Sequence, residues 1–324
     1  MTLSRCLLLL AVVAAAVPPA WRVAAAEAYP TRPVRLVVGF PAGGPNDTLA
    51  RLIGQWLSQK LGQPFVVENQ PGNSGNIATA AVVRAPPDGY TLLLVGPANA
   101  ISGSLNDKLD FNFLRDIAPV AGITREPLVM LVHPSVPATT VAEFIAHAKA
   151  DASRITMAST GQGSSPHVTG ELFRMMTGLD LKVVHYAGGG PALKEMIAGH
   201  AQVMFEPMSA SIGPIRNGEL RPLAVTTAAR AAALPDVPPL AETVPGYEAS
   251  AVTGIGAPKN TPAEIVDALN RAINAAFADP DMKARIADTG GIALAGSPAD
   301  FGRLMAGETE KWAKVIRFSG AKAN

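Results

Sequence analysis

The 324-residue sequence has a single cysteine, few charged side chains and no run of basic residues. Charged residues make up 16% of the chain, against roughly 25% in an average soluble protein. The 27 basic and 26 acidic side chains give a formal net charge of +1. Because nucleic-acid binding needs a basic patch, we expect no nucleic-acid partner. The 48% hydrophobic content argues against a disordered chain, and the length predicts about two domains.

The first 26 residues have the layout of a secretory signal peptide. Arg5 precedes an apolar run at 7–17, and alanines at 24–26 provide a small-residue cleavage site. The run is too short to span a hydrocarbon core of about 30 Å, and a buried N-terminal helix is the alternative interpretation. We therefore expect residues 1–26 to be removed and the mature protein to be exported and soluble. Cleavage also removes Cys6, so we expect no disulfide and no cysteine metal ligand.

Short apolar strands alternate with helices along the rest of the chain. Helix starts are indicated by Asn46 or Asp47, by capping boxes at 140–143 and 261–264, and by a related pattern at 297–300. Strands separated by helices of about 10–15 residues predict an α/β fold with mainly parallel sheets. The predicted strands are 34–40, 64–68, 90–95, 128–133, 155–159, 183–186, 202–206, 220–226 and 251–257.

Three junctions between a strand and the next helix, at 40–47, 159–167 and 187–191, are rich in glycine and small polar residues. Glycine allows a ligand to approach the backbone closely, and the following helix presents unpaired N–H groups and the positive end of its dipole. Such junctions suit an anion, especially a carboxylate. None contains lysine or arginine, which predicts a site of modest affinity that releases its ligand readily. The alternative is that the glycines serve turn geometry alone.

The candidate ligand-binding residues in these junctions share small size or hydrogen-bonding capacity. They are Phe40, Pro41, Ala42, Gly43, Gly44, Asn46, Asp47, Ser159, Thr160, Gly161, Gly163, Ser164, Ser165, His167, Ala187, Gly188 and Gly189. Asp47 is either a helix cap or a carboxylate that orients its loop or meets a ligand. Glu206, at the end of a predicted strand, has the same ambiguity. A bulky side chain at Gly163 is expected to weaken ligand binding with little loss of folding.

Signatures of catalysis are weak. The glycine loops lack the phosphate-loop, dinucleotide and nucleophile-elbow patterns, and the five histidines form no metal-spaced pair. We therefore expect no catalytic residue, no metal and no cofactor. The alternative is a secreted serine hydrolase that uses Ser164 or Ser165 with His167, although we interpret His167 as a helix-start residue.

Segments spread in order over nearly all of the expected mature chain resemble the Bug family of periplasmic solute-binding receptors of tripartite tricarboxylate transporters. The similar segments are 29–36, 40–51, 67–72, 87–93, 163–167, 185–205, 223–226 and 234–238. The resemblance implies a hinged, two-domain periplasmic binding protein of type II, with the ligand in the cleft between the lobes. Domain I would combine 27–125 with 251–324, and domain II would be 126–250.

The resemblance also implies partners and site residues. The loops at 41–47 and 160–167 would face each other across the cleft and bind a small di- or tricarboxylate or related organic acid. Membrane permease subunits would receive the ligand from a monomeric receptor, and a receptor that feeds a sensor kinase is the alternative. Family members often have lysine where this chain has Ala187, and commonly aspartate at Glu206; Asn99 would supply a polar contact where the 97–99 segment departs from the family.

Overall fold

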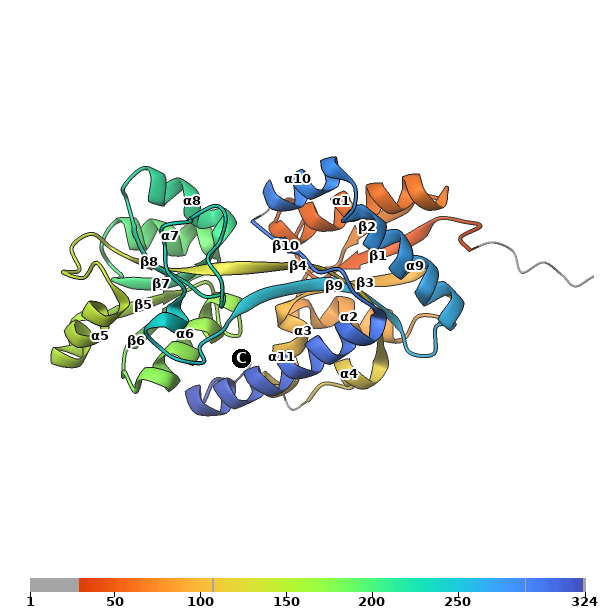
Figure 1. Ribbon diagram of the computed structural model, residues 1–324. Helices are drawn as coiled ribbons and strands as arrows, with labels where there is room; N and C mark the ends of the chain where they lie inside the picture. Colours follow the sequence, from red (N-terminus) through yellow and green to blue (C-terminus); the bar gives the residue numbers. More distant parts are fainter. Residues whose placement is uncertain (1–28, 107, 289, 323–324) are drawn as a thin grey trace, which may run out of the picture.

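The computed structural model describes residues 29–106, 108–288 and 290–322, so the predicted signal peptide lies outside the described residues. Two lobes lie side by side and are joined by the long strands β4 (Ile117–Val132) and β9 (Ser250–Pro258) (Figure 1). The C-terminal helix α11 (Pro298–Ser319) runs along the lower edge of both lobes in this view. Among the described residues, no helix has both the length and the apolar character needed to span a bilayer.

Lobe I contains the N-terminal end of the described chain and most of the segment that follows β9. Its strands are β1 (Val34–Val38), β2 (Phe65–Asn69), β3 (Thr91–Val95) and β10 (Ile292–Ala293). Its helices are α1 (Pro45–Leu61), α2 (Asn76–Val83), α3 (Pro97–Leu105), α4 (Phe113–Asp116), α9 (Ala263–Ala276) and α10 (Pro280–Asp288), with the 3-10 turn η1 (Asn73–Gly75).

Lobe II is built from the middle of the chain. Its strands are β5 (Thr156–Ser159), β6 (Lys182–His185), β7 (Val203–Pro207) and β8 (Arg221–Val225). Its helices are α5 (Val141–Ala150), α6 (Ser165–Thr177), α7 (Gly189–Ile197) and α8 (Met208–Arg216), with the 3-10 turns η2 (Ala152–Arg154) and η3 (Leu240–Glu242). The α/β fold predicted from the alternation of strands and helices is therefore present.

A single hydrogen-bonded path of strands crosses both lobes in the order β2-β1-β3-β9-β4-β7-β5-β6, with β8 and β10 also paired to β4. The first part of β4 pairs with β9 over 117–127, and its last part pairs with β7 and β8 over 128–132. Strands β1, β2 and β3 pair in parallel, as do β5, β6 and β7, whereas every pair that involves β4 or β9 is antiparallel. The expectation of mainly parallel sheets is therefore wrong at the connection between the lobes, because β4 and β9 run in opposite directions there.

Several local predictions also need correction. The predicted strand at 128–133 covers only the last five residues of β4, and prolines at 119 and 127 weaken the strand signal in the part that was not predicted. Helix α9 begins at Ala263 with no side-chain cap, since Thr261 Oγ1 donates to the Pro258 carbonyl instead of capping the helix. The predicted caps at Thr140 and Ser297 are confirmed, and each accepts a hydrogen bond from the backbone of the acidic residue three positions on.

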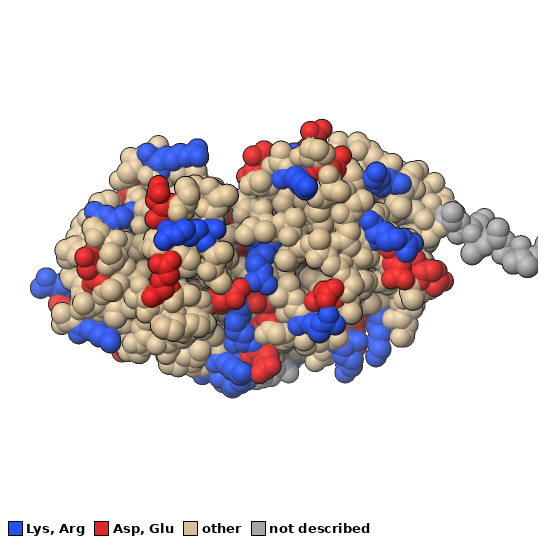
Figure 2. All heavy atoms as spheres, viewed as in Figure 1, with Lys and Arg blue, Asp and Glu red and all other residues tan. Residues whose placement is uncertain are grey.

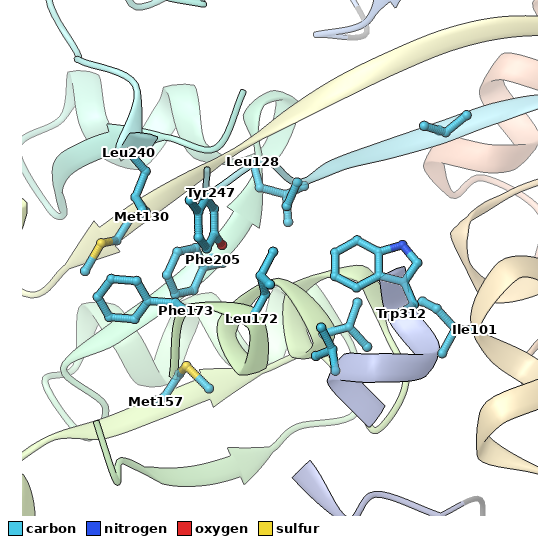
Figure 3. Packing of buried hydrophobic residues seen from close by; sticks show 14 of the residues in the cluster. Ile101, Leu128, Met130, Met157, Leu172, Phe173, Phe205, Leu240, Tyr247 and Trp312 are labelled. Carbon is cyan, nitrogen blue, oxygen red and sulfur yellow. The ribbon is translucent and has the colours of Figure 1, made fainter. Parts of the chain in front are cut away.

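Apolar packing is continuous from lobe II to α11. In lobe II, Phe173 packs against Phe205, which stacks on Tyr247. Farther along the same cluster, Trp312 of α11 lies beside Ile101 of α3, a lobe I residue (Figure 3). Helix α11 packs against α3, β4 and α6, so it contacts both lobes although the sequence assigned it to domain I alone.

Candidate ligand-binding cleft

A cavity of about 370 Å³ lies between the lobes. Its size falls within the usual range for small-molecule sites. A second cavity of about 320 Å³ shares five of its lining residues, so the two are parts of one cleft. Figure 2 shows this region as a notch between the lobes at the top of the view. The residues along the first cavity are Phe40, Pro45, Asn46, Ser74, Pro97, Ala98, Glu126, Thr160, Gly161, Gln162, Gly163, Ser164, Ser165, Pro207, Ala251 and Thr253.

Four helices begin at this cavity. Lobe I supplies the first residues of α1 and α3, at Pro45 and Pro97, and lobe II supplies the starts of α6 and α8, at Ser165 and Pro207. The first turn of a helix leaves backbone N–H groups without intrahelical acceptors and carries a partial positive charge. Among the described residues that line the two cavities there is no lysine or arginine. Any positive electrostatic contribution from these lining residues therefore comes from backbone dipoles and not from cationic side chains.

Asp47 holds the first glycine loop in shape. Its Oδ2 atom accepts hydrogen bonds from the Gly43 backbone at 2.8 Å and from Arg51 Nε at 2.9 Å, and its Oδ1 accepts from Asn69 at 3.0 Å. The side chain is buried, and the hydrogen bonds from Arg51 and Gly43 lower the pKa of Asp47 to about 2. The helix cap is Gly44, which offers no side-chain bond, so neither Asn46 nor Asp47 is the cap. Asp47 instead orients the loop that presents Asn46 to the cavity.

A buried histidine holds the second glycine loop. The Gly163 backbone donates to His167 Nδ1 at 3.0 Å, and the His167 ring lies 4.7 Å from the His185 ring, edge to face. Burial, with smaller contributions from His185 and Arg174, lowers the pKa of His167 to about 4. His167 is therefore a neutral acceptor at pH 7.

The serine hydroxyls of this loop have two different environments. Ser164 caps α6 and accepts a hydrogen bond from the His167 backbone, as expected of a helix start. Ser165 is one of the residues that line the cavity, but its Oγ is inaccessible to solvent and has no partner among the described residues. Neither hydroxyl is hydrogen-bonded to the His167 ring within the described part of the chain, so the nucleophile–base pair of a hydrolase is not formed. Ser165 borders the cleft as a residue, and its Oγ is a buried hydroxyl without a hydrogen-bond partner among the described residues.

The strands that join the lobes form the floor of the cleft. Thr124 and Thr253 face each other on β4 and β9, and their hydroxyls are 2.6 Å apart. Two residues further along β4, Glu126 lines both cavities, and burial raises the pKa of its carboxyl. A search for glycine-rich junctions could not identify the residues of this floor, because they lie within strands.

The third glycine junction lies behind the cavity wall. Ala187, Gly188 and Gly189 do not line either cavity, but the Gly189 backbone passes close to Glu206 and Thr160. Glu206 is 3% exposed, and its Oε2 has no partner among the described residues. Burial and the nearby Glu126 raise the pKa of Glu206 to about 8.

The structure brings only part of the predicted set to the cleft. Asn99 faces away: its side chain accepts from Gly96 and donates to Thr79, and it borders a separate cavity behind α3. Ser159 bonds the Gly161 backbone and lies near His185, so it supports its loop from below. Pro41, Ala42 and Gly44 do not line either cavity, whereas Gly43 lines the second. Sequence reasoning missed Pro45, Ser74, Pro97, Ala98, Glu126, Gln162, Pro207, Ala251 and Thr253, and only the helix-start prolines gave a local signal.

The lobes approach each other beside the cleft at Gly163 and at Gly290. A Cβ atom at Gly163 would clash with Leu105 Cδ1 of α3, and one at Gly290 would lie 3.1 Å from the Ser209 backbone. Gly163 also has φ +73°, a backbone conformation that disfavours other residues. The structure therefore argues against the expectation that a bulky residue at Gly163 causes little loss of folding, because such a residue adds backbone strain and pushes on the other lobe.

The described residues contain no group of three or more His, Cys, Asp or Glu side chains arranged to hold a metal ion. The hydrogen-bond donors along the two cavities are hydroxyls, side-chain amides and helix N-termini, and the carboxylates of Glu126 and Asp288 lie beside them.

Comparison with known proteins places these features in a family context. The model of the tripartite tricarboxylate transporter family receptor matches residues 49–320. Protein BugT of Bordetella pertussis is 35% identical over 300 residues, which cover 92% of each chain. An R. palustris structure with adipate is 37% identical, with a TM-score of 0.80 over 91% of this chain and 99% of the other. The R. palustris protein MatC with bound malate is 31% identical, with a TM-score of 0.77 over 89% of this chain and 100% of the other.

Proposed function

The chain belongs to the receptors of the tripartite tricarboxylate transporter family, and from that premise we propose that it is a periplasmic receptor for a small organic acid. The receptor binds its ligand in the cleft between the lobes without chemical turnover and delivers it to membrane permease subunits. Residues 1–26 act as a signal peptide that directs export and is then removed. The adipate and malate in the structures of two relatives support a carboxylate as the ligand class.

The observation that carries this proposal is the convergence of four helix N-termini, two from each lobe, on one cavity without lysine or arginine. A charge beside one such terminus gains about 0.3–1 kcal/mol at the surface and up to about 2 kcal/mol when partly buried. The first turn of α8 already donates to Glu126, so the termini of α1, α3 and α6 are the ones left to supply part of the roughly 8 kcal/mol that micromolar binding requires. Because both lobes contribute such termini, closing the lobes assembles the anion site and opening them releases the ligand.

Binding is tested by calorimetry and thermal shift with mono-, di- and tricarboxylates, together with mass spectrometry of the recovered ligand. We expect at least one carboxylate to raise the melting temperature by several degrees and to be recovered intact. Consumption of the ligand would contradict a receptor, and no binding by any organic acid would contradict the ligand class. Delivery is tested by uptake of labelled ligand in cells that express the permease with and without this protein.

Ser165 provides a residue-level test. Ser165→Ala removes a hydroxyl that has no protein partner, so we expect almost no change in the free energy of unfolding. Loss of a hydrogen bond to a charged ligand is expected to weaken affinity about 10-fold. Ser297→Ala is the matched control: it removes a capping serine on α11, away from the cleft, and is expected to reduce stability but not affinity. Unchanged affinity in Ser165→Ala would exclude this hydroxyl from the site.

A further inference from the structure

Glu126 is the one charged side chain along the cavity between the lobes, within the part of the chain that the structure describes. It also lines the adjoining cavity, where Asp288 adds a second acid and no basic residue is present. The helix N-termini attract one carboxylate, but the floor of the cleft carries negative charge. A ligand with two carboxylates would place one of them near Glu126.

The position of Glu126 is set by its contacts. Its Oε1 accepts hydrogen bonds from the Ser209 backbone at 3.1 Å and from the Ser209 hydroxyl at 2.7 Å, which tie β4 to the first turn of α8. Its Oε2 accepts no hydrogen bond from the described residues, and the residue borders the cavity. The carboxylate therefore retains an acceptor that a ligand can use.

Glu206 adds a second buried acid on the same side of the cleft. Its Oε2 lacks a partner among the described residues, and its electrostatic interaction with Glu126 is unfavourable for a negative charge on either group. Arg125, next to Glu126 in sequence, is paired with Glu248, and Arg216 lies at the far end of α8. A further negative charge at this end of the cleft has no counter-ion among the described residues.

We propose that Glu126 determines ligand specificity by selecting organic acids that carry an N–H donor, an ammonium or an amide, at the end opposite the carboxylate. This inference rests on the proposed function, because the helix N-termini must hold the carboxylate end. An ammonium or amide donates to the Glu126 carboxylate, whereas a second carboxylate at the same place is repelled. The cleft then binds a zwitterion or a monoamide more tightly than a dicarboxylate of the same length.

The test compares three ligands of similar length by calorimetry at pH 7.5: adipate, adipic acid monoamide and 6-aminohexanoate. We expect the wild-type protein to bind the amide or the amine at least 10-fold more tightly than adipate. In Glu126→Gln, adipate should bind more tightly and 6-aminohexanoate more weakly, so that the preference falls by 10-fold or more. Glu310→Gln is the matched control, since it removes the same charge from an exposed site on α11, and it should preserve the wild-type preference.

Two results would overturn the inference. One is tighter binding of adipate than of both nitrogen-bearing ligands by the wild-type protein, a measurement that needs no variant to fold. The other is an identical preference in wild type and Glu126→Gln. Failure of the proposed function is distinguishable, because in that case no organic acid in the wider panel binds at all.

Discussion

At the residue scale, the shape of the cleft depends on buried side chains that fix the conformation of the glycine loops and do not themselves line the cavity. Asp47 and His167 each accept a hydrogen bond from a loop glycine, Gly43 and Gly163 respectively. Both acceptors are buried, and both have pKa values shifted so that the acceptor form is populated at neutral pH. Each lobe therefore fixes its glycine loop with a buried side-chain acceptor. This acceptor is a carboxylate in lobe I and a neutral imidazole in lobe II.

His167 makes stability depend on pH in a defined window. Its pKa is about 4 in the folded protein and about 6.5 in an unfolded chain, so the unfolded state binds more protons between these values. Stability therefore falls as the pH drops from about 6.5 to about 4, by at most about 1.4 kcal/mol per pH unit from this group. We expect His167→Asn, which keeps an acceptor but does not titrate, to have a flatter profile in urea unfolding at pH 4.5, 5.5 and 7.5. Parallel profiles would show that His167 does not cause the dependence.

At the element scale, α11 is held by packing more than by its cap. Trp312 is buried against both lobes and donates to Glu308 at 2.7 Å, whereas the Ser297–Asp300 capping box is exposed. We expect Trp312→Ala to lower the free energy of unfolding by about 3–5 kcal/mol, as other large core truncations do. Ser297→Ala is expected to cost about 1 kcal/mol. Denaturant titration checks both values, and comparable losses would mean that helix initiation rather than packing stabilises α11.

At the scale of the whole molecule, the contact between Gly163 and Leu105 couples the lobes. Gly163→Ala introduces strain at φ +73° and places a methyl group against Leu105 of the other lobe. We expect it to hinder full closure and to weaken ligand binding about 10-fold, in addition to a stability loss of about 1 kcal/mol. Calorimetry measures the affinity, and small-angle scattering measures how much the ligand compacts the protein.

Gly178→Ala is the matched control for this prediction. Gly178 has φ +69° at the end of α6, and an added Cβ atom there meets nothing within 4 Å. It should therefore show the same strain and stability loss with unchanged affinity and compaction. Equal effects of the two variants on affinity would show that strain in lobe II, and not contact between the lobes, controls binding.

Local sequence signals determined the α/β alternation, most strands and the two loops that reach the cleft, because hydrophobic periodicity, glycine and capping residues act over a few positions. They could not identify Glu126, Ala251 and Thr253, which lie in strands and contact the cavity only because β4 and β9 pair across more than a hundred residues of sequence. They also could not show that Asn46 lines the cleft whereas Asn99 faces away from it. Tertiary structure alone decided which helix N-termini converge, since that depends on how two lobes pack around antiparallel connecting strands.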